Sequence, residues 1–305
     1  MDWLKVFISF QSSVMLNTYI NAVLPLTKQA DGKYIYDEVV QNIGPNYFAI
    51  RDTASTPYSF PSRGIVPTIR TMSSADFPNM MGPSNNPALS SRRGDGDVPA
   101  DQYRLVEVAG MPHNSIFSNT YASSATDLAK IGYKITASDV TFSYASTKST
   151  NDFPAQYFYR GAEADIVKWV RNGIKPPYAP RITYSPMHGT EEIEYLEDQY
   201  GNTVGGLRNH WVDFPTGAYI PHSYNDPVVS GSGQFTRNYK IPFAADKIHQ
   251  LYGTKSNLMR QYYQGIDQPV AGRWITPEDA VLAKNDIATS LLNWKYAFMA
   301  FPGAK

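Results

Sequence analysis

The sequence predicts an α/β fold built on a mostly parallel sheet, and three segments support this. Leu4–Phe10 (LKVFISF) is rich in β-branched and aromatic residues, as a buried strand is. Gln11–Val23 follows at once with helical periodicity and ends at Pro25. Gly64–Met72 and Tyr103–Ala109 are two further strand candidates, and each leads into a polar loop. Strands that alternate with helices in this way form parallel sheets covered on both faces.

The sheet looks incomplete at its N-terminal side, because a sheet buried on both faces needs about five strands or more. We therefore expect the N-terminal strands to be missing, and the exposed sheet edge to make the isolated chain aggregate or need a partner. Residues 1–180 are expected to form the partial core and residues 181–305 a helical and irregular extension packed on it. Helices are expected at four places: around Ala162–Asn172, Ala244–Tyr252, Ser256–Gln264 and from Thr276 onward.

Composition excludes several classes of protein. The chain has 305 residues, of which 42% are hydrophobic, so it can bury a sizeable core. Its 27 basic and 27 acidic residues balance, which gives no electrostatic reason to expect nucleic acid as a partner. The absence of cysteine excludes disulfides, thiolate catalysis and cysteine-based zinc sites. No apolar run is long enough for a membrane span. The sequence does not identify a compartment.

Four stretches, in this order, resemble a family of large α/β-hydrolase-domain proteins, and the tail Arg273–Ala280 (RWITPEDA) fits as well. They are FQSSVMLNTYINAVLPL (10–26), VPTIRTMSSADFP (66–78), RRGDGD…YRLVEVAGMPHN (92–114) and GNTVGGLRNHWVDFPTGAY (201–219). The corresponding family patterns are a G-x-S-Q-[ST] nucleophile elbow with its helix, a strand ending in T-E-x-[DE], an A-G-x-x-H loop, and G-G-[VL]-R…V-D-x-P-x-A-x-Y. The resemblance covers nearly the whole chain and implies an α/β-hydrolase fold.

The resemblance also implies candidate catalytic residues, since acyl transfer on this fold uses a serine, an acid and a histidine in that chain order. His113 matches the histidine of the A-G-x-x-H loop and would act as the base. Of the two acid positions after the second strand candidate, Ser74 occupies the first and Asp76 the second, so Asp76 is the candidate acid. The alternative for Asp76 is a local role as a turn or cap residue, and for His113 a loop position with no catalytic role.

No serine fits the nucleophile position, which requires small residues two before and two after it. The resemblance places Phe10 there, with Ile8 where the leading glycine belongs. Moving the register to Ser9 or Ser12 puts bulky residues at the small positions. Gln11 keeps its place, and its backbone N–H is the candidate oxyanion-hole donor. We expect the three strand candidates to be neighbouring parallel strands, with Gln11, Asp76 and His113 gathered at one edge of the sheet.

The predicted function is therefore that of a serine ester or amide hydrolase impaired by Phe10, with a small-molecule ester or amide as substrate if it is active. Two alternatives stay open: a non-catalytic binding or scaffold protein, and the truncated product of an active hydrolase gene. We expect no cofactor, no nucleic acid and no membrane span. We also expect no metal, because the remaining histidines show no HExxH or paired-ligand spacing.

Overall fold

The computed structural model describes residues 5–9, 11–43, 63–77, 92–113, 132, 149–185, 194–221 and 238–293. The chain forms two compact units, each assembled from separated segments. Unit 1 comprises Met1–Ala109, Gly161–Leu196 and Thr203–Leu207, and unit 2 comprises Gly110–Arg160, Glu197–Asn202 and Arg208–Lys305. The expected division of the chain at residue 180 stays a prediction.

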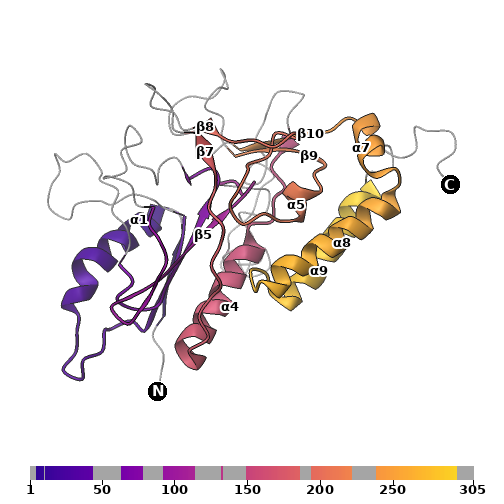
Figure 1. Ribbon diagram of the computed structural model, residues 1–305. Coiled ribbons are helices and arrows are strands. Elements are labelled where there is room, and N and C mark those ends of the chain that lie inside the picture. The colour runs from indigo at the N-terminus through magenta and orange to yellow at the C-terminus, as the bar shows by residue number, and fades with distance from the viewer. Residues whose placement is uncertain are drawn as a thin grey trace. The chain divides into compact units, whose positions relative to one another are not determined.

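Unit 1 is built on a mostly parallel sheet, as the sequence predicts (Figure 1). Within the described ranges the sheet has five strands in the order β1-β2-β3-β5-β4. All neighbouring pairs are parallel except β4 with β5, which is antiparallel. The strands are β1 (Lys5–Ser9), β2 (Glu38–Asn42), β3 (Thr68–Ser73), β4 (Gly96–Val98) and β5 (Asp101–Val108).

Two of these strands, β2 and β4, were not expected from the sequence. The three predicted strands were expected to be neighbours, and this is wrong for the first two, because β2 pairs with β1 on one side and with β3 on the other. β2 reads EVVQN, with polar residues at three of its five positions, yet every side chain in it is buried. A strand with so many polar residues lacks the apolar pattern by which buried strands are predicted. Hydrogen bonds that allow polar side chains to be buried, such as that of Gln41, are not visible in the sequence.

The helix after β1 forms as predicted but changes its winding. α1 (Gln11–Thr18) continues as a π-helical segment, Tyr19–Val23, and ends in a 3₁₀ turn, Leu24–Leu26, where Pro25 stops it. One face of this helix packs on the sheet and its following loop. The buried cluster consists of Leu16, Ile20, Leu24, Val39 and Val66.

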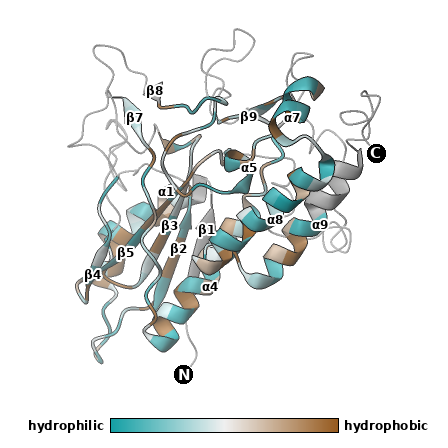
Figure 2. Cartoon of the chain, turned by 45° about the vertical axis from the view of Figure 1, so that its right-hand side comes forward, coloured by the Kyte–Doolittle hydropathy of each residue, from teal (hydrophilic) through white to brown (hydrophobic). Residues whose placement is uncertain are grey.

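The helix predicted around Ala162 is α4 (Gln156–Asn172), which belongs to unit 1 from Gly161 onward. It ends where the Asn-Gly pair predicts: the N–H of Gly173 donates to the carbonyl of Trp169 at 2.9 Å. In Figure 2 hydrophobic and hydrophilic residues alternate along α4, as expected of a helix that buries one face. Ile166 on the buried face is 0% exposed.

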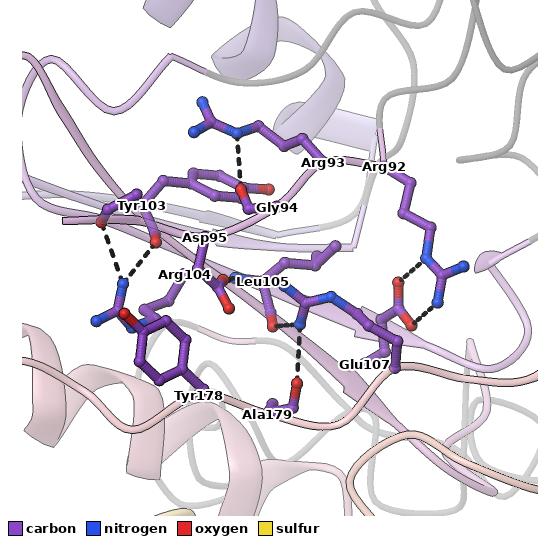
Figure 3. Close-up of polar contacts among 12 residues, drawn as sticks. Arg92, Arg93, Gly94, Asp95, Tyr103, Arg104, Leu105, Glu107, Tyr178 and Ala179 are labelled. Atoms are coloured by element: carbon purple, nitrogen blue, oxygen red, sulfur yellow. Dashed lines mark hydrogen bonds and ion pairs between the residues drawn. The ribbon is translucent and has the colours of Figure 1, made fainter.

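Glu107 of β5 carries a fully buried carboxylate that three donors satisfy (Figure 3). Arg92 binds it with two parallel hydrogen bonds, from Nε at 2.7 Å and Nη2 at 2.8 Å. The backbone N–H of Ile182 donates to Oε2 at 2.7 Å. The carbonyl of Glu107 accepts from the N–H of Leu207 at 2.6 Å. One residue of β5 thus fixes three segments that are far apart in the sequence.

Arg181 forms a second link between β5 and the segment that follows α4. Its Nη1 donates to the carbonyls of Leu105 and Ala179, and its Nη2 lies 3.0 Å from Asp95 Oδ1. The same oxygen of Asp95 accepts from the N–H of Leu105 at 2.8 Å. The carboxylate therefore holds both the arginine and the backbone of β5.

Arg104, on the other face of β5, is 2% exposed and forms a third link. It donates to the carbonyl of Pro176 at 2.9 Å and to Asp97 at 2.7 Å, and its guanidinium lies over the ring of Trp169. Hydrogen bonds from Tyr178 and then from Arg104 hold the pKa of Asp97 well below its usual range. The arginines near β5 are therefore paired with acids of the same unit.

Unit 2 combines a small antiparallel sheet with helices. The sheet has the order β6-β10-β9. Three of its helices were predicted, and the last begins as expected, with Thr276 Oγ1 accepting from the N–H of Asp279 at 3.1 Å. The elements are β6 (Ser149–Thr150), α5 (His210–Asp213), β9 (Gly217–Ile220), β10 (Tyr239–Pro242), α7 (Ala245–Tyr252), α8 (Lys255–Ala271) and α9 (Pro277–Asn293). A further two-stranded sheet, β7 (Tyr184–Ser185) with β8 (Glu194–Tyr195), lies in unit 1.

The Glu107→Gln substitution should destabilise the protein by about 2–3 kcal/mol, because it leaves Arg92 without a carboxylate in a largely buried position. The matched control is Asp267→Asn, which removes the carboxylate of the exposed Lys284–Asp267 pair and should cost about 0–1 kcal/mol. Chemical denaturation of both variants measures the free energies of unfolding. Equal losses in the two variants would show that Glu107 does not anchor β5.

Candidate active site

The ends of the parallel strands place the elbow and acid positions at one edge of the unit 1 sheet. In the register of the sheet Ser9 of β1 lies opposite Asn42 of β2, and Asn42 lies opposite Thr71 of β3. β1 ends at Ser9 and α1 begins at Gln11, so one residue separates strand from helix. That residue, Phe10, lies outside the described residues, as do the side chains of Ser9, Gln11 and Ser12.

The first turn of α1 is tied to the end of β2. Ser13 Oγ donates to the carbonyl of Asn42 at 2.7 Å, and Gln41 Nε2 donates to the carbonyl of Ser13 at 2.9 Å. These two bonds fix the start of the helix relative to the sheet. They also commit the hydroxyl of Ser13 to the backbone, so Ser13 does not serve as a displaced nucleophile.

The acid loop after β3 is buried and ordered by its own side chains. Asp76 is 2% exposed and accepts a hydrogen bond at Oδ2 from Ser73 Oγ, while its N–H donates back to Ser73 Oγ at 3.0 Å. Ser74, at the first acid position, donates its hydroxyl to the carbonyl of Val108 at 2.9 Å. Ser74 therefore joins the ends of β3 and β5. Asp76 carries the carboxylate among the described residues of this loop. Its hydrogen bonds with Ser73 within the turn are compatible with its candidate catalytic role.

The histidine loop belongs to unit 2 and is tightly packed there. Gly110 has a φ of +76°, and a Cβ on it would lie 2.5 Å from Val212 Cγ1 and 3.7 Å from Phe153 and Tyr219. His113 itself is 8% exposed. The A-G-x-x-H loop thus packs on the 212–219 segment, so two of the stretches that carry the resemblance are in contact. Asp76 and Gln11 belong to unit 1, and the predicted grouping of all three residues stays a prediction.

The two adjacent glycines of the G-G-[VL]-R stretch lie at a close approach of backbones in unit 1. Gly205 and Gly206 have φ values of +74° and +68°. A Cβ would lie 2.5 Å from the carbonyl of Arg181 at the first position and 2.9 Å from that of Glu107 at the second. Leu207 then forms a parallel bridge with Val108. Only glycine fits this crossing without displacing β5.

Comparison with protein families decides the identity of the fold. A model of the alpha/beta hydrolase domain family matches residues 9–284. The chain belongs to this family. No curated protein and no solved structure matches the chain significantly. The match begins at the end of β1 and includes Asp76 and His113.

Arg208 and Asp213 form an ion pair in unit 2. Arg208 Nε donates to Asp213 at 2.7 Å, and its Nη2 donates to Asp198 at 2.8 Å. Both acids also lie in unit 2, so the arginine joins α5 to the turn at 198–202. Within the described ranges of the chain, no three histidine, aspartate or glutamate side chains are grouped as metal ligands. In the same ranges, no helix has the length and apolarity that crossing a membrane requires.

His210 is a buried histidine of unit 2 for which the sequence gave no role. It is 0% exposed, and neither ring nitrogen has a hydrogen-bond partner. Its ring lies against Trp211, with centroids 3.4 Å apart, and meets the edge of Tyr262 at 5.6 Å. Burial holds the pKa of His210 well below its usual range, so the imidazole is neutral in the folded protein.

Sequence reasoning missed two polar residues at the sheet edge, Asn42 and Thr71. Both are 0% exposed, and both side chains lack hydrogen-bond partners. Asn42 lies on β2, the strand that the apolar pattern did not detect. The one feature of the sequence that could have indicated a strand end at Asn42 is the apolar pair Val39 and Val40 just before it.

The Gly110→Ala substitution should destabilise unit 2 by at least about 2 kcal/mol, because a positive φ strains any residue with a Cβ and the new methyl overlaps Val212. Gly253→Ala is the matched control: its φ is +68°, but nothing lies within 4 Å of the added methyl. It should cost only the conformational term of about 1–2 kcal/mol. Thermal unfolding of both variants measures the difference. Adding Val212→Ala to Gly110→Ala should recover part of the loss, and a loss no greater than in the control would refute the packing argument.

His210 should make folding stability depend on pH. Its folded pKa lies below its unfolded value of about 6.5, so the unfolded chain binds a proton that the folded chain does not. Stability from this residue is complete above about pH 6.5 and is lost as the pH falls, by up to about 1.4 kcal/mol per pH unit. His210→Gln removes the titration, so the stability difference between wild type and variant should shrink from pH 7.5 to pH 5. Parallel pH profiles of the two proteins would contradict the assignment.

Proposed function

We propose that this protein is an α/β-hydrolase with the site of a serine ester or amide hydrolase, whose acyl-transfer activity is impaired because Phe10 occupies the nucleophile position. The single observation that carries the proposal is the junction between β1 and α1. The strand ends at Ser9 and the helix begins at Gln11, and this supports the proposal that position 10 is where the fold presents its nucleophile. A phenyl ring has no group that attacks a carbonyl.

The remaining residues keep the roles that a hydrolase needs. His113 would take the proton from an attacking group, and Asp76 would orient the imidazole. The N–H of Gln11 would donate to the oxyanion from the start of α1, where helix backbone donors are free. The substrate class is a small ester or amide. Without a serine, only water activated by His113 would attack, and losing the serine of such a triad costs about 10⁶-fold in turnover.

A binding protein without catalysis is the second candidate. It is favoured by the same phenylalanine together with the intact packing of the histidine loop on Val212 and the ordered acid loop around Asp76. Such a protein would keep a ligand site and lose the chemistry. The two candidates predict different results when a serine is introduced at position 10. In an impaired hydrolase His113 and Asp76 would activate this serine, whereas in a binding protein they would not.

Fluorophosphonate probes label only activated serines, so the wild-type chain should not be labelled. It should also show no ester hydrolysis that depends on His113. The double substitution Phe10→Ser with Ile8→Gly restores a hydroxyl and a small residue at the elbow. It should gain labelling at position 10, and adding His113→Ala should abolish that labelling.

Two outcomes would contradict the proposal. Stoichiometric labelling of the wild-type chain at Ser9 or Ser12, lost in His113→Ala, would show a working serine hydrolase with a different register. A folded double variant that remains unlabelled would show that the elbow, acid and histidine positions do not form a hydrolase site, and would favour the binding protein. Mass spectrometry of the labelled peptide identifies the serine, and circular dichroism confirms folding.

A further inference from the structure

Three buried polar atoms without partners lie together at the carboxyl edge of the unit 1 sheet. They are Nδ2 and Oδ1 of Asn42 and Oγ1 of Thr71. The two residues face each other across the parallel pair β2 and β3. Residues paired in this way direct their side chains to the same face of the sheet. Buried polar groups are almost always hydrogen-bonded, so three orphaned atoms at one place require an explanation.

The pair lies on the face of the sheet opposite α1. Gln41 reaches Ser13 of α1 with its side chain, and side chains alternate along a strand. Asn42 therefore directs its amide to the other face. Asn42 also lies opposite Ser9, the residue directly before the nucleophile position. The polar pair is thus one strand away from the elbow.

The backbone beside the pair is strained. Ile43, directly after Asn42, has a φ of +57°, which a β-branched residue rarely adopts. Its N–H donates to the carbonyl of Thr71 at 2.8 Å, so β3 holds it in this conformation. Strain of this kind concentrates at ligand clamps and active sites. Strain and unpaired polar atoms both oppose folding, so neither is explained by stability.

We infer that Asn42 and Thr71 form a subsite for a ligand group that carries both a hydrogen-bond donor and an acceptor, namely a primary amide or a hydroxyl. A carboxamide complements the Asn42 side chain, since its carbonyl accepts from Nδ2 and its N–H donates to Oδ1. The Thr71 hydroxyl either donates or accepts as the ligand requires. The inference rests on the proposed function in one respect: the amide or hydroxyl that binds Asn42 and Thr71 is assigned to the ligand of the proposed site at position 10.

The subsite is covered in the structure, because all three atoms are buried. Binding therefore requires the covering side chains to move aside. The hydrogen bonds gained by three atoms that have none provide the driving force. A ligand with the same shape but no donor gains less, because it leaves Oδ1 unpaired.

Acetamide and acetone are the probes, since they share one shape and differ in the replacement of NH₂ by CH₃. The full chain is labelled with ¹⁵N at asparagine, and the side-chain amide signal of Asn42 is assigned by its absence in Asn42→Ser. Acetamide should shift this signal saturably and bind at least fivefold more tightly than acetone. The signal of Asn202, whose amide already bonds to Tyr219 and Gly217, is the internal control and should not move.

Two variants complete the test. Thr71→Val should weaken acetamide binding at least threefold. Asn42→Leu should melt at the same temperature as the wild type or higher, because it removes an unsatisfied group. No saturable shift, an equal response to the two probes, or a fall of several degrees in Asn42→Leu would overturn the inference. None of these readouts depends on a nucleophile, so a failure here is distinguishable from a failure of fluorophosphonate labelling in the back-substituted chain.

Discussion

The structure of unit 1 depends on a carboxylate buried in its sheet. An ionised group without water is costly unless donors surround it, and Glu107 obtains those donors from Arg92 and from the backbone of Ile182. Because the donors come from distant parts of the sequence, satisfying one charge also fixes the path of the chain. The strand that leads into the histidine loop is therefore positioned by electrostatics as much as by apolar packing. The same logic extends to Arg104 and Arg181, whose partners are Asp97 of β4 and Asp95 directly before this strand.

How much of the fold the sequence predicts depends on which force buries each element. β3 and β5 are visible in the sequence because β-branched and aromatic residues fill them. The helices end or begin at residues with a local physical role, such as Gly173 and Thr276. β2 is invisible because three of its five residues are polar, and Gln41 reveals nothing of its contact with Ser13 until the chain is folded. Local signals identify local structure, whereas buried polar strands are specified by their partners.

The same distinction between local signals and distant partners applies to the residues of the candidate site. Asp76 and Ser74 could be placed after a strand from the sequence, because the β-branched residues Thr68, Ile69 and Thr71 precede them and indicate that strand. The link from Ser74 to Val108 could not, since a serine in a polar loop resembles any other until β5 lies beside it. Gly110 is similar: the sequence indicates a turn, and only its contact with Val212 explains why no larger residue fits. Grouping of His113 with Asp76 and Gln11 remains a prediction from the order of the motifs.

At Gly205 and Gly206 two backbone segments cross, and this bears on what membership of the family says about activity. These glycines are required by the approach of two backbones, and Gly110 by the packing of a loop, so the residues that identify the family secure its architecture. Selection for folding and selection for chemistry then act on different positions. A lineage is free to exchange a catalytic serine while Gly110, Gly205 and Gly206 stay in place, since these glycines serve the packing of the backbone and not the reaction. Such a chain keeps the inherited shape after the inherited reaction is gone, and its shape becomes available for another use.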